Sequence, residues 1–87
     1  MGYEKTPQMT RKHEIIIALH KSYYHALTGI ALYLTLNEPD ANELVSSTFE
    51  KICAWRIEKL EDMILWEKPT TLAYLSKTLN HTHIDAL

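Results

Sequence analysis

Apolar side chains recur at every third or fourth position through the first third of the chain, the spacing that places them on one face of an α-helix. The stripe consists of Ile16, Leu19, Tyr23, Leu27, Ile30 and Leu34. Thr6 and Pro7 precede it, and a threonine cap followed by proline is typical of a helix start. We therefore predict a helix over about residues 7–36, with a kink or a close helix contact at Gly29.

The segment Asn37-Glu38-Pro39-Asp40 is the first clear break in this pattern. Asp40 followed three positions later by Glu43 is close to a capping box, so it predicts the start of a second helix over about residues 41–67. The apolar stripe of this helix consists of Val45, Phe49, Ile52, Cys53, Ile57, Leu60, Met63 and Ile64. Pro69 ends it, because proline has no amide hydrogen to donate inside a helix.

A short third helix is predicted over about residues 71–80. It begins near Thr70 or Thr71, and its apolar edge contains Leu75 and Leu79. Asn80 is a natural residue for a left-handed cap at the end of a helix.

The fold class that follows is all-α: a long antiparallel helical hairpin with a short C-terminal helix in a single domain, residues 1–87. Two glycines and three prolines are too few for a β-sandwich or barrel, which needs many tight turns. Trp55 and Trp66 are eleven positions apart, so on one helix they share a second face. A two-helix hairpin covers each apolar stripe from one side only, and we therefore expect a homodimer that completes a bundle.

Charge and cysteine usage narrow the function classes. The net charge is −2, with acids and bases interspersed, so no basic stripe for phosphate contacts is evident. A single cysteine, Cys53, favours a reducing compartment, and we expect a cytoplasmic protein. Lys21 lies within the longest apolar region, where a charge opposes membrane insertion, so no membrane contact is expected.

No residue constellation indicates catalysis. His81, His83 and Asp85 are close in sequence, but a structural zinc site needs four ligands, usually including thiolates. Cys53 lies on an apolar stripe, which is typical of an inert buried thiol. We therefore predict a non-enzymatic protein without catalytic, cofactor-binding or metal residues, and a metal-binding helical protein is the less favoured alternative.

Aromatic residues are the candidate contacts with a protein partner, because tryptophan and tyrosine dominate the energetics of protein interfaces. The candidates are Tyr23, Tyr24, Trp55, Trp66 and Tyr74. We expect a small regulatory or adaptor protein that acts through helix-face contacts with another protein.

Residues 69–82 support a second interpretation. Pro69, Thr70, Leu75, Leu79 and Thr82 follow the register of a capped leucine-rich helix, a turn and a second cap. This segment resembles the first half of the helix-turn-helix in winged-helix repressors of the MarR type, with Ser76 where alanine is usual and Asn80 where glycine is usual.

The resemblance implies a DNA-binding transcriptional regulator with residues 69–87 at the groove. Its candidate DNA contacts are Thr71, Lys77, Asn80, His81, Thr82 and His83. Five residues follow Thr82, fewer than the roughly three turns of a recognition helix that crosses the major groove. Nucleic acid is therefore the alternative partner rather than the favoured one.

Overall fold

The structure is a computed structural model that describes residues 7–87, with side chains from Thr10 onward. These residues form four helices and no strand, so the all-α prediction is confirmed. The helices are α1 (Pro7–Thr35), α2 (Glu38–Cys53), α3 (Ile57–Leu65) and α4 (Lys68–Asp85). Thr6, the predicted cap of the first helix, lies outside the described residues.

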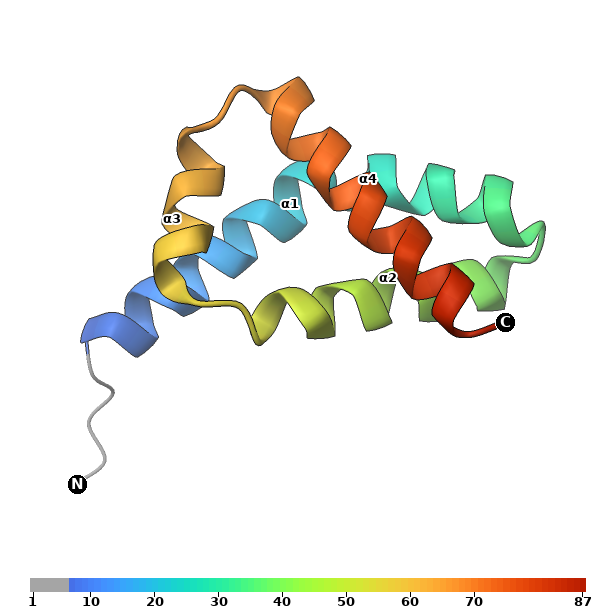
Figure 1. Ribbon diagram of the computed structural model, residues 1–87, viewed down its shortest axis with the longest axis horizontal. Coiled ribbons are helices and arrows are strands. Elements are labelled where there is room, and N and C mark those ends of the chain that lie inside the picture. The colour runs from blue at the N-terminus through green and yellow to red at the C-terminus, as the bar shows by residue number, and fades with distance from the viewer. Residues whose placement is uncertain (1–6) are drawn as a thin grey trace.

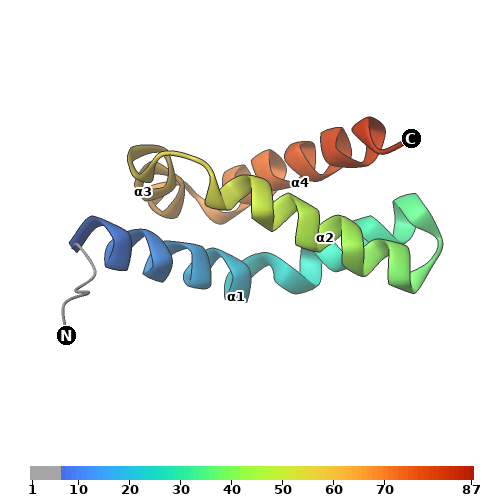
Figure 2. The same cartoon turned by 90° about the horizontal axis from the view of Figure 1, so that it is seen from below.

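The helices form a flat arrangement that measures 45 × 31 × 20 Å. Figure 1 shows α2 running back alongside α1 in the opposite direction, with α4 crossing both and α3 near the start of α1. In Figure 2, α1 forms one outer layer and α3 and α4 form the other. The C-terminal end of α4 thus lies near the connection between α1 and α2.

Helix α1 passes through Gly29 without interruption. Gly29 is exposed, and a Cβ atom built there would meet no other atom within 4 Å. The close helix contact expected at this glycine is therefore absent within the described part of the chain.

The connection between α1 and α2 consists of Leu36 and Asn37. Leu36 adopts a left-handed conformation with φ of 56°, unusual for a leucine. Asn37 caps α2, since its Oδ1 accepts a hydrogen bond from the amide of Asp40 at 2.9 Å. The prediction that Asp40 is the cap was therefore wrong: this carboxylate lies in the first turn, where it complements the helix dipole.

The predicted second helix over residues 41–67 is two helices, because the chain leaves helical geometry between Cys53 and Ile57. Arg56 is extended there, with φ of −69° and ψ of 148°. No glycine or proline marks this break. Its physical reason is tertiary: redirecting the chain brings Leu60 and Met63 into the same buried cluster as the leucines of α4.

The third predicted helix is much longer than residues 71–80, because α4 runs from Lys68 to Asp85. Pro69 lies in its first turn, where a missing amide hydrogen is tolerated, and does not simply end the preceding helix. Asn80 is not a left-handed cap, because its φ is not positive. Among the described non-glycine residues, only Leu36 has a positive φ. The helix continues because both Leu79 and Thr82 are buried, and a turn at Asn80 would pull Thr82 out of the interface.

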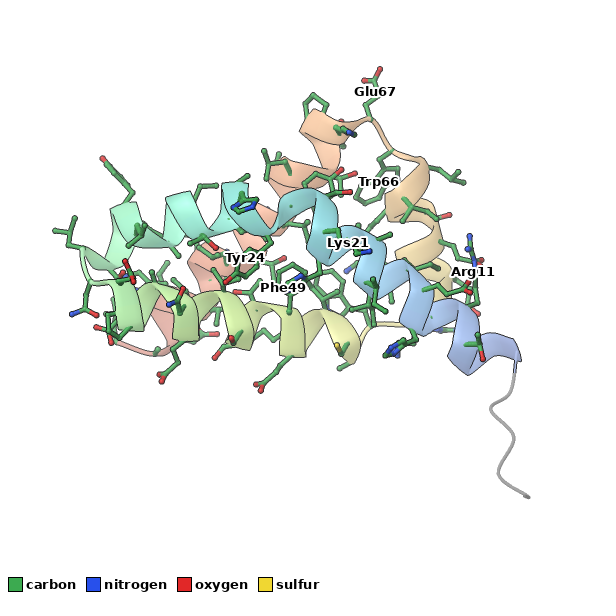
Figure 3. The ribbon with its side chains drawn as sticks, turned by 180° about the vertical axis from the view of Figure 1, so that it is seen from behind. Arg11, Lys21, Tyr24, Phe49, Trp66 and Glu67 are labelled. Carbon is green, nitrogen blue, oxygen red and sulfur yellow. The ribbon has the colours of Figure 1, made fainter. Side chains whose placement is uncertain are left out.

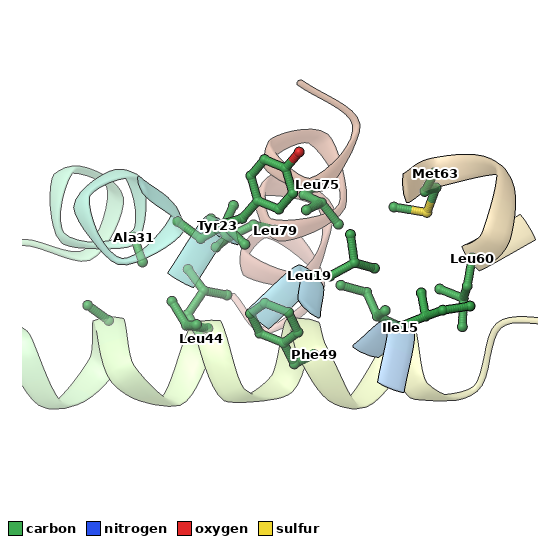
Figure 4. Packing of buried hydrophobic residues seen from close by; sticks show 14 residues of the cluster. Ile15, Leu19, Tyr23, Ala31, Leu44, Phe49, Leu60, Met63, Leu75 and Leu79 are labelled. Carbon is green, nitrogen blue, oxygen red and sulfur yellow. The ribbon is translucent and has the colours of Figure 1, made fainter. Parts of the chain in front are cut away.

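The core receives side chains from all four helices. Figure 4 shows Ile15, Leu19, Tyr23 and Ala31 from α1, Leu44 and Phe49 from α2, Leu60 and Met63 from α3, and Leu75 and Leu79 from α4. Tyr23 of α1 lies beside Leu75 and Leu79, so α4 is held against the α1 and α2 pair by apolar contacts. No helix between residues 7 and 87 combines the length and apolarity needed to cross a bilayer.

The left-handed Leu36 provides a stability prediction. Glycine adopts this conformation without the clash of a Cβ atom, and little packing is lost because the Leu36 side chain is 85% exposed. We expect Leu36→Gly to raise the free energy of unfolding by about 0.5–1 kcal/mol, the strain relief less the entropy cost of glycine. Urea unfolding at low protein concentration measures it.

The matched control is Leu36→Ala, which removes the same exposed side chain but keeps the Cβ atom and its strain. It should change the unfolding free energy by less than about 0.5 kcal/mol. Equal effects of the two substitutions would contradict the left-handed conformation.

Candidate partner-binding site

Three of the five candidate aromatic residues converge on one place. Trp55 comes from the segment between α2 and α3, Trp66 follows the end of α3, and Tyr74 lies in α4. The ring centroid of Tyr74 is 5.7 Å from that of Trp55 and 5.6 Å from that of Trp66, with interplanar angles of 81° and 63°. This edge-to-face geometry is the favourable arrangement of aromatic pairs. We call Trp55, Trp66 and Tyr74 the aromatic cluster.

A lysine completes the aromatic cluster. The Lys59 Nζ lies 4.1 Å from the centroid of Trp55 and 4.7 Å from that of Tyr74. A cation over the face of a ring is attracted by the negative potential of the ring. We did not predict this contact from the sequence. The available signal was the spacing, because Lys59 follows Trp55 by four positions.

The connection between α3 and α4 is fixed by a buried threonine. The Thr71 Oγ1 donates a hydrogen bond to the carbonyl oxygen of Met63 at 2.9 Å, and the residue is fully buried. This bond links the last turn of α3 to the first turn of α4, on either side of Trp66. Figure 3 shows Trp66 turned inward from this connection and Glu67 turned outward.

The two tryptophans therefore meet in a way the sequence analysis did not predict. We placed them on a shared face of one continuous helix, but the break between α2 and α3 puts each in a different connection. Their common contact is Tyr74 of α4. The fold brings them together through tertiary packing, not through helical periodicity.

The aromatic cluster remains accessible to a partner, because all three of its residues are only half-buried. Next to Trp66, Leu65 is 81% exposed and Ile64 is exposed as well. Neither was a predicted contact, and their positions at the end of α3 could not be inferred before the break was known. Ile64 and Leu65 form an exposed apolar area at the end of α3, directly before Trp66 in the sequence.

The other two candidates lie elsewhere. Tyr23 is only 8% exposed and belongs to the core, so we no longer place it on a partner-binding surface. Tyr24 is half-buried on α1 and stacks on His20, with ring centroids 4.8 Å apart. His20 in turn lies 4.7 Å from the ring of Phe49 in α2, so this contact joins α1 to α2.

The helix-turn-helix predicted for residues 69–87 is wrong, because α4 continues through the position of the expected turn. Thr82 is not a second cap: its Oγ1 donates to the carbonyl of Thr78 at 2.8 Å, inside the same helix. Thr71 and Thr82 are both buried, whereas Lys77, Asn80 and His81 are exposed and His83 is half-buried. The six candidate DNA contacts therefore do not share one accessible surface.

A cleft of about 520 Å³ lies between the C-terminal end of α4 and the junction of α1 with α2. Leu34, Asp40, Glu43, Leu44 and His83 are among the residues that line it. Among the described side chains, no three histidine, cysteine, aspartate or glutamate residues are grouped so that they could hold a metal ion.

Tyr74 is the residue on which the aromatic cluster depends, because it contacts both indoles. We expect Tyr74→Ala to lower the free energy of unfolding by about 2–3 kcal/mol and to shift tryptophan fluorescence to longer wavelength, as both indoles become more hydrated. Tyr33→Ala is the control, since Tyr33 is 81% exposed. An unchanged emission maximum in Tyr74→Ala would contradict the cluster.

Comparisons of the chain with protein-family models, with curated proteins and with solved structures gave no match. The interpretation of function therefore rests on the geometry of the described residues.

Proposed function

We propose that this chain is a small non-enzymatic regulatory or adaptor protein that binds another protein through the aromatic cluster and the neighbouring Leu65. The observation that carries the proposal is the convergence of Trp55, Trp66 and Tyr74 from three separate segments into a half-exposed group. Aromatic side chains of this kind supply most of the binding energy in many interfaces.

The aromatic cluster is ordered before any partner binds. Each indole is already held against Tyr74, and Lys59 lies over two of the rings. Fixing a side chain on binding costs about 0.5–1.5 kcal/mol, so rings that are already fixed bind at a smaller entropic cost. Leu65 adds an exposed apolar side chain that a partner would remove from water.

The charges around the aromatic cluster indicate the chemistry of the partner. Asp62 is exposed on α3 and Glu67 turns outward at the connection to α4, while the basic Arg56 and Lys68 are exposed in the same region. Two further carboxylates are paired within the chain, Glu58 with Arg56 at 3.4 Å and Glu61 with Arg11 at 3.3 Å. Interfaces combine an apolar centre with a polar rim whose charges complement those of the partner. We therefore expect a partner surface with an apolar centre and a rim that carries charges of both signs.

The chain is also proposed to form a homodimer, but not one that completes a bundle, because α4 provides the cover that a second copy was expected to provide. α4 covers the inner side of the α1 and α2 pair, but the opposite side of α1 has no covering helix within the described residues. DNA binding has no comparable support, since the expected turn is replaced by continuous helix.

Binding experiments with charged substitutions test the proposed partner surface. Leu65→Asp places a carboxylate in the apolar area and should weaken binding of the natural partner at least tenfold, because burying an unpaired charge is costly. Ile84→Asp is the matched control, since Ile84 is also exposed but lies at the far end of α4. The measurement is retention of proteins from the source cells on each immobilised variant, followed by titration of the purified partner.

A partner retained by the unmodified chain and by Ile84→Asp, but lost with Leu65→Asp, is the expected result. Rising salt should weaken the purified complex, because the rim charges become screened. A partner that binds Leu65→Asp as strongly as the unmodified chain would refute the assignment of this surface.

A further inference from the structure

The outer face of α1 is exposed and largely apolar, although Lys21 and His25 also lie on it. Its apolar part consists of the small residues Ala18, Ser22, Ala26 and Gly29 and the larger residues Ile17, Leu32 and Tyr33, and the exposed Leu36 follows directly after the helix. Between Glu14 and Glu38 the only charged side chain is Lys21. The exposed sides of α2 and α3 differ, since they carry several carboxylates each. An exposed face of this composition along a whole helix is typical of an interaction surface.

Gly29 has no structural role inside the chain. It lies within an α-helix without a positive φ, and a side chain there would enter open space. A glycine in a helix interior is unfavourable relative to alanine because of its backbone freedom. The absence of a side chain does allow another helix to approach closely at this position.

The small and large apolar residues of this face are unevenly distributed along the helix. Ala18 and Ser22 are small and lie in the N-terminal half beside the larger Ile17, whereas Leu32 and Tyr33 are large and lie in the C-terminal half. A second copy of α1 in the opposite direction could therefore place Tyr33 against a small residue. If the midpoint falls between His25 and Ala26, Ser22 faces Gly29 and Ala18 faces Tyr33.

Charge also selects the antiparallel direction. Glu38 and Asp40 are exposed just beyond the end of α1. Arg11 and Lys12 lie near its start, where Arg11 is also paired with Glu14 at 3.9 Å and with Glu61 at 3.3 Å. Parallel helices would bring the two acidic ends together. Antiparallel helices separate them, place each near the basic residues of the other copy, and oppose the two helix dipoles.

We propose that two copies of this chain pair through the outer faces of α1, antiparallel and about a two-fold axis near Ala26. This inference rests on the proposed homodimer and adds its surface, direction and register. Because α3 and α4 form the opposite layer of each copy, the dimer would leave both aromatic clusters free to bind partners. The contact from Ile17 to Tyr33 would extend for about 24 Å along each helix. A contact of this length is expected to bury an area near the lower end of the range for stable interfaces, with a dissociation constant of about micromolar order.

Substitution of Gly29 separates dimer formation from folding. Gly29→Gln adds a side chain that the monomer accommodates in open space but that the close helix contact does not. We expect it to keep or raise the thermal stability of a dilute sample and to raise the dimer dissociation constant at least tenfold. Ala73→Gln, at an exposed alanine of α4, is the control and should leave dimerisation unchanged. Sedimentation equilibrium over a range of concentrations measures the association.

Cysteine cross-linking tests direction and register. Cys53 is exposed and not buried as its place on an apolar stripe predicted, so Cys53→Ser is first used to remove this native thiol. Ala26→Cys chains should form disulfide-linked dimers on mild oxidation, because this position lies near the two-fold axis. Tyr33→Cys chains should not cross-link with themselves, but should do so when mixed with Ala18→Cys chains.

Each contrary outcome identifies what is wrong. A chain that stays monomeric at every concentration overturns the homodimer, while the effect of Leu65→Asp on partner binding would still stand. A dimer that Gly29→Gln leaves intact overturns the surface, and efficient cross-linking of Tyr33→Cys with itself overturns the antiparallel direction.

Discussion

The packing of α4 across α1 and α2 is the interaction on which the rest of the structure depends. Leu75 and Leu79 are fully buried, and Thr71 and Thr82 extend the buried side of α4 over most of its length. Complete burial of one leucine contributes about 1.5–3 kcal/mol, so these two side chains alone provide a large part of the stability of a small domain. Without α4, the apolar groove between α1 and α2 would be exposed to water; α4 covers it.

This packing determines where the proposed contact surfaces lie. For α4 to return across the pair, α2 must end at Cys53 and α3 must turn away, and both connections then carry a tryptophan to Tyr74. The same arrangement covers only the inner side of α1. Its outer side, with Gly29 and Tyr33, stays exposed. The packing of α4 across α1 and α2 therefore assembles the aromatic cluster in one layer and leaves the outer face of α1 uncovered in the other.

The sequence allowed prediction of features that rest on local patterns. Helix α1 ends within one residue of its predicted boundary because its apolar stripe is long and regular. The break between α2 and α3 could not be predicted, since Ala54, Trp55 and Arg56 carry no turn signal and only tertiary burial of Leu60 and Met63 decides it. Chain reversal uses Leu36 in a left-handed conformation, whereas Asn80, a better residue for that role, stays helical. The positions of Tyr23, which is buried in the core, and Tyr24, which lies away from the aromatic cluster, could not be predicted either. Burial depends on packing partners that periodicity does not identify.

The most direct test of this account is a measurement of contacts between α1 and α4. Figure 4 places the ring of Tyr23 beside Leu75 and Leu79. Nuclear Overhauser effects between the ring protons of Tyr23 and the methyl groups of both leucines are therefore predicted in a dilute, folded sample. If these effects are absent while the circular dichroism still shows a largely helical chain, α4 does not lie across α1, and the aromatic cluster loses its structural basis.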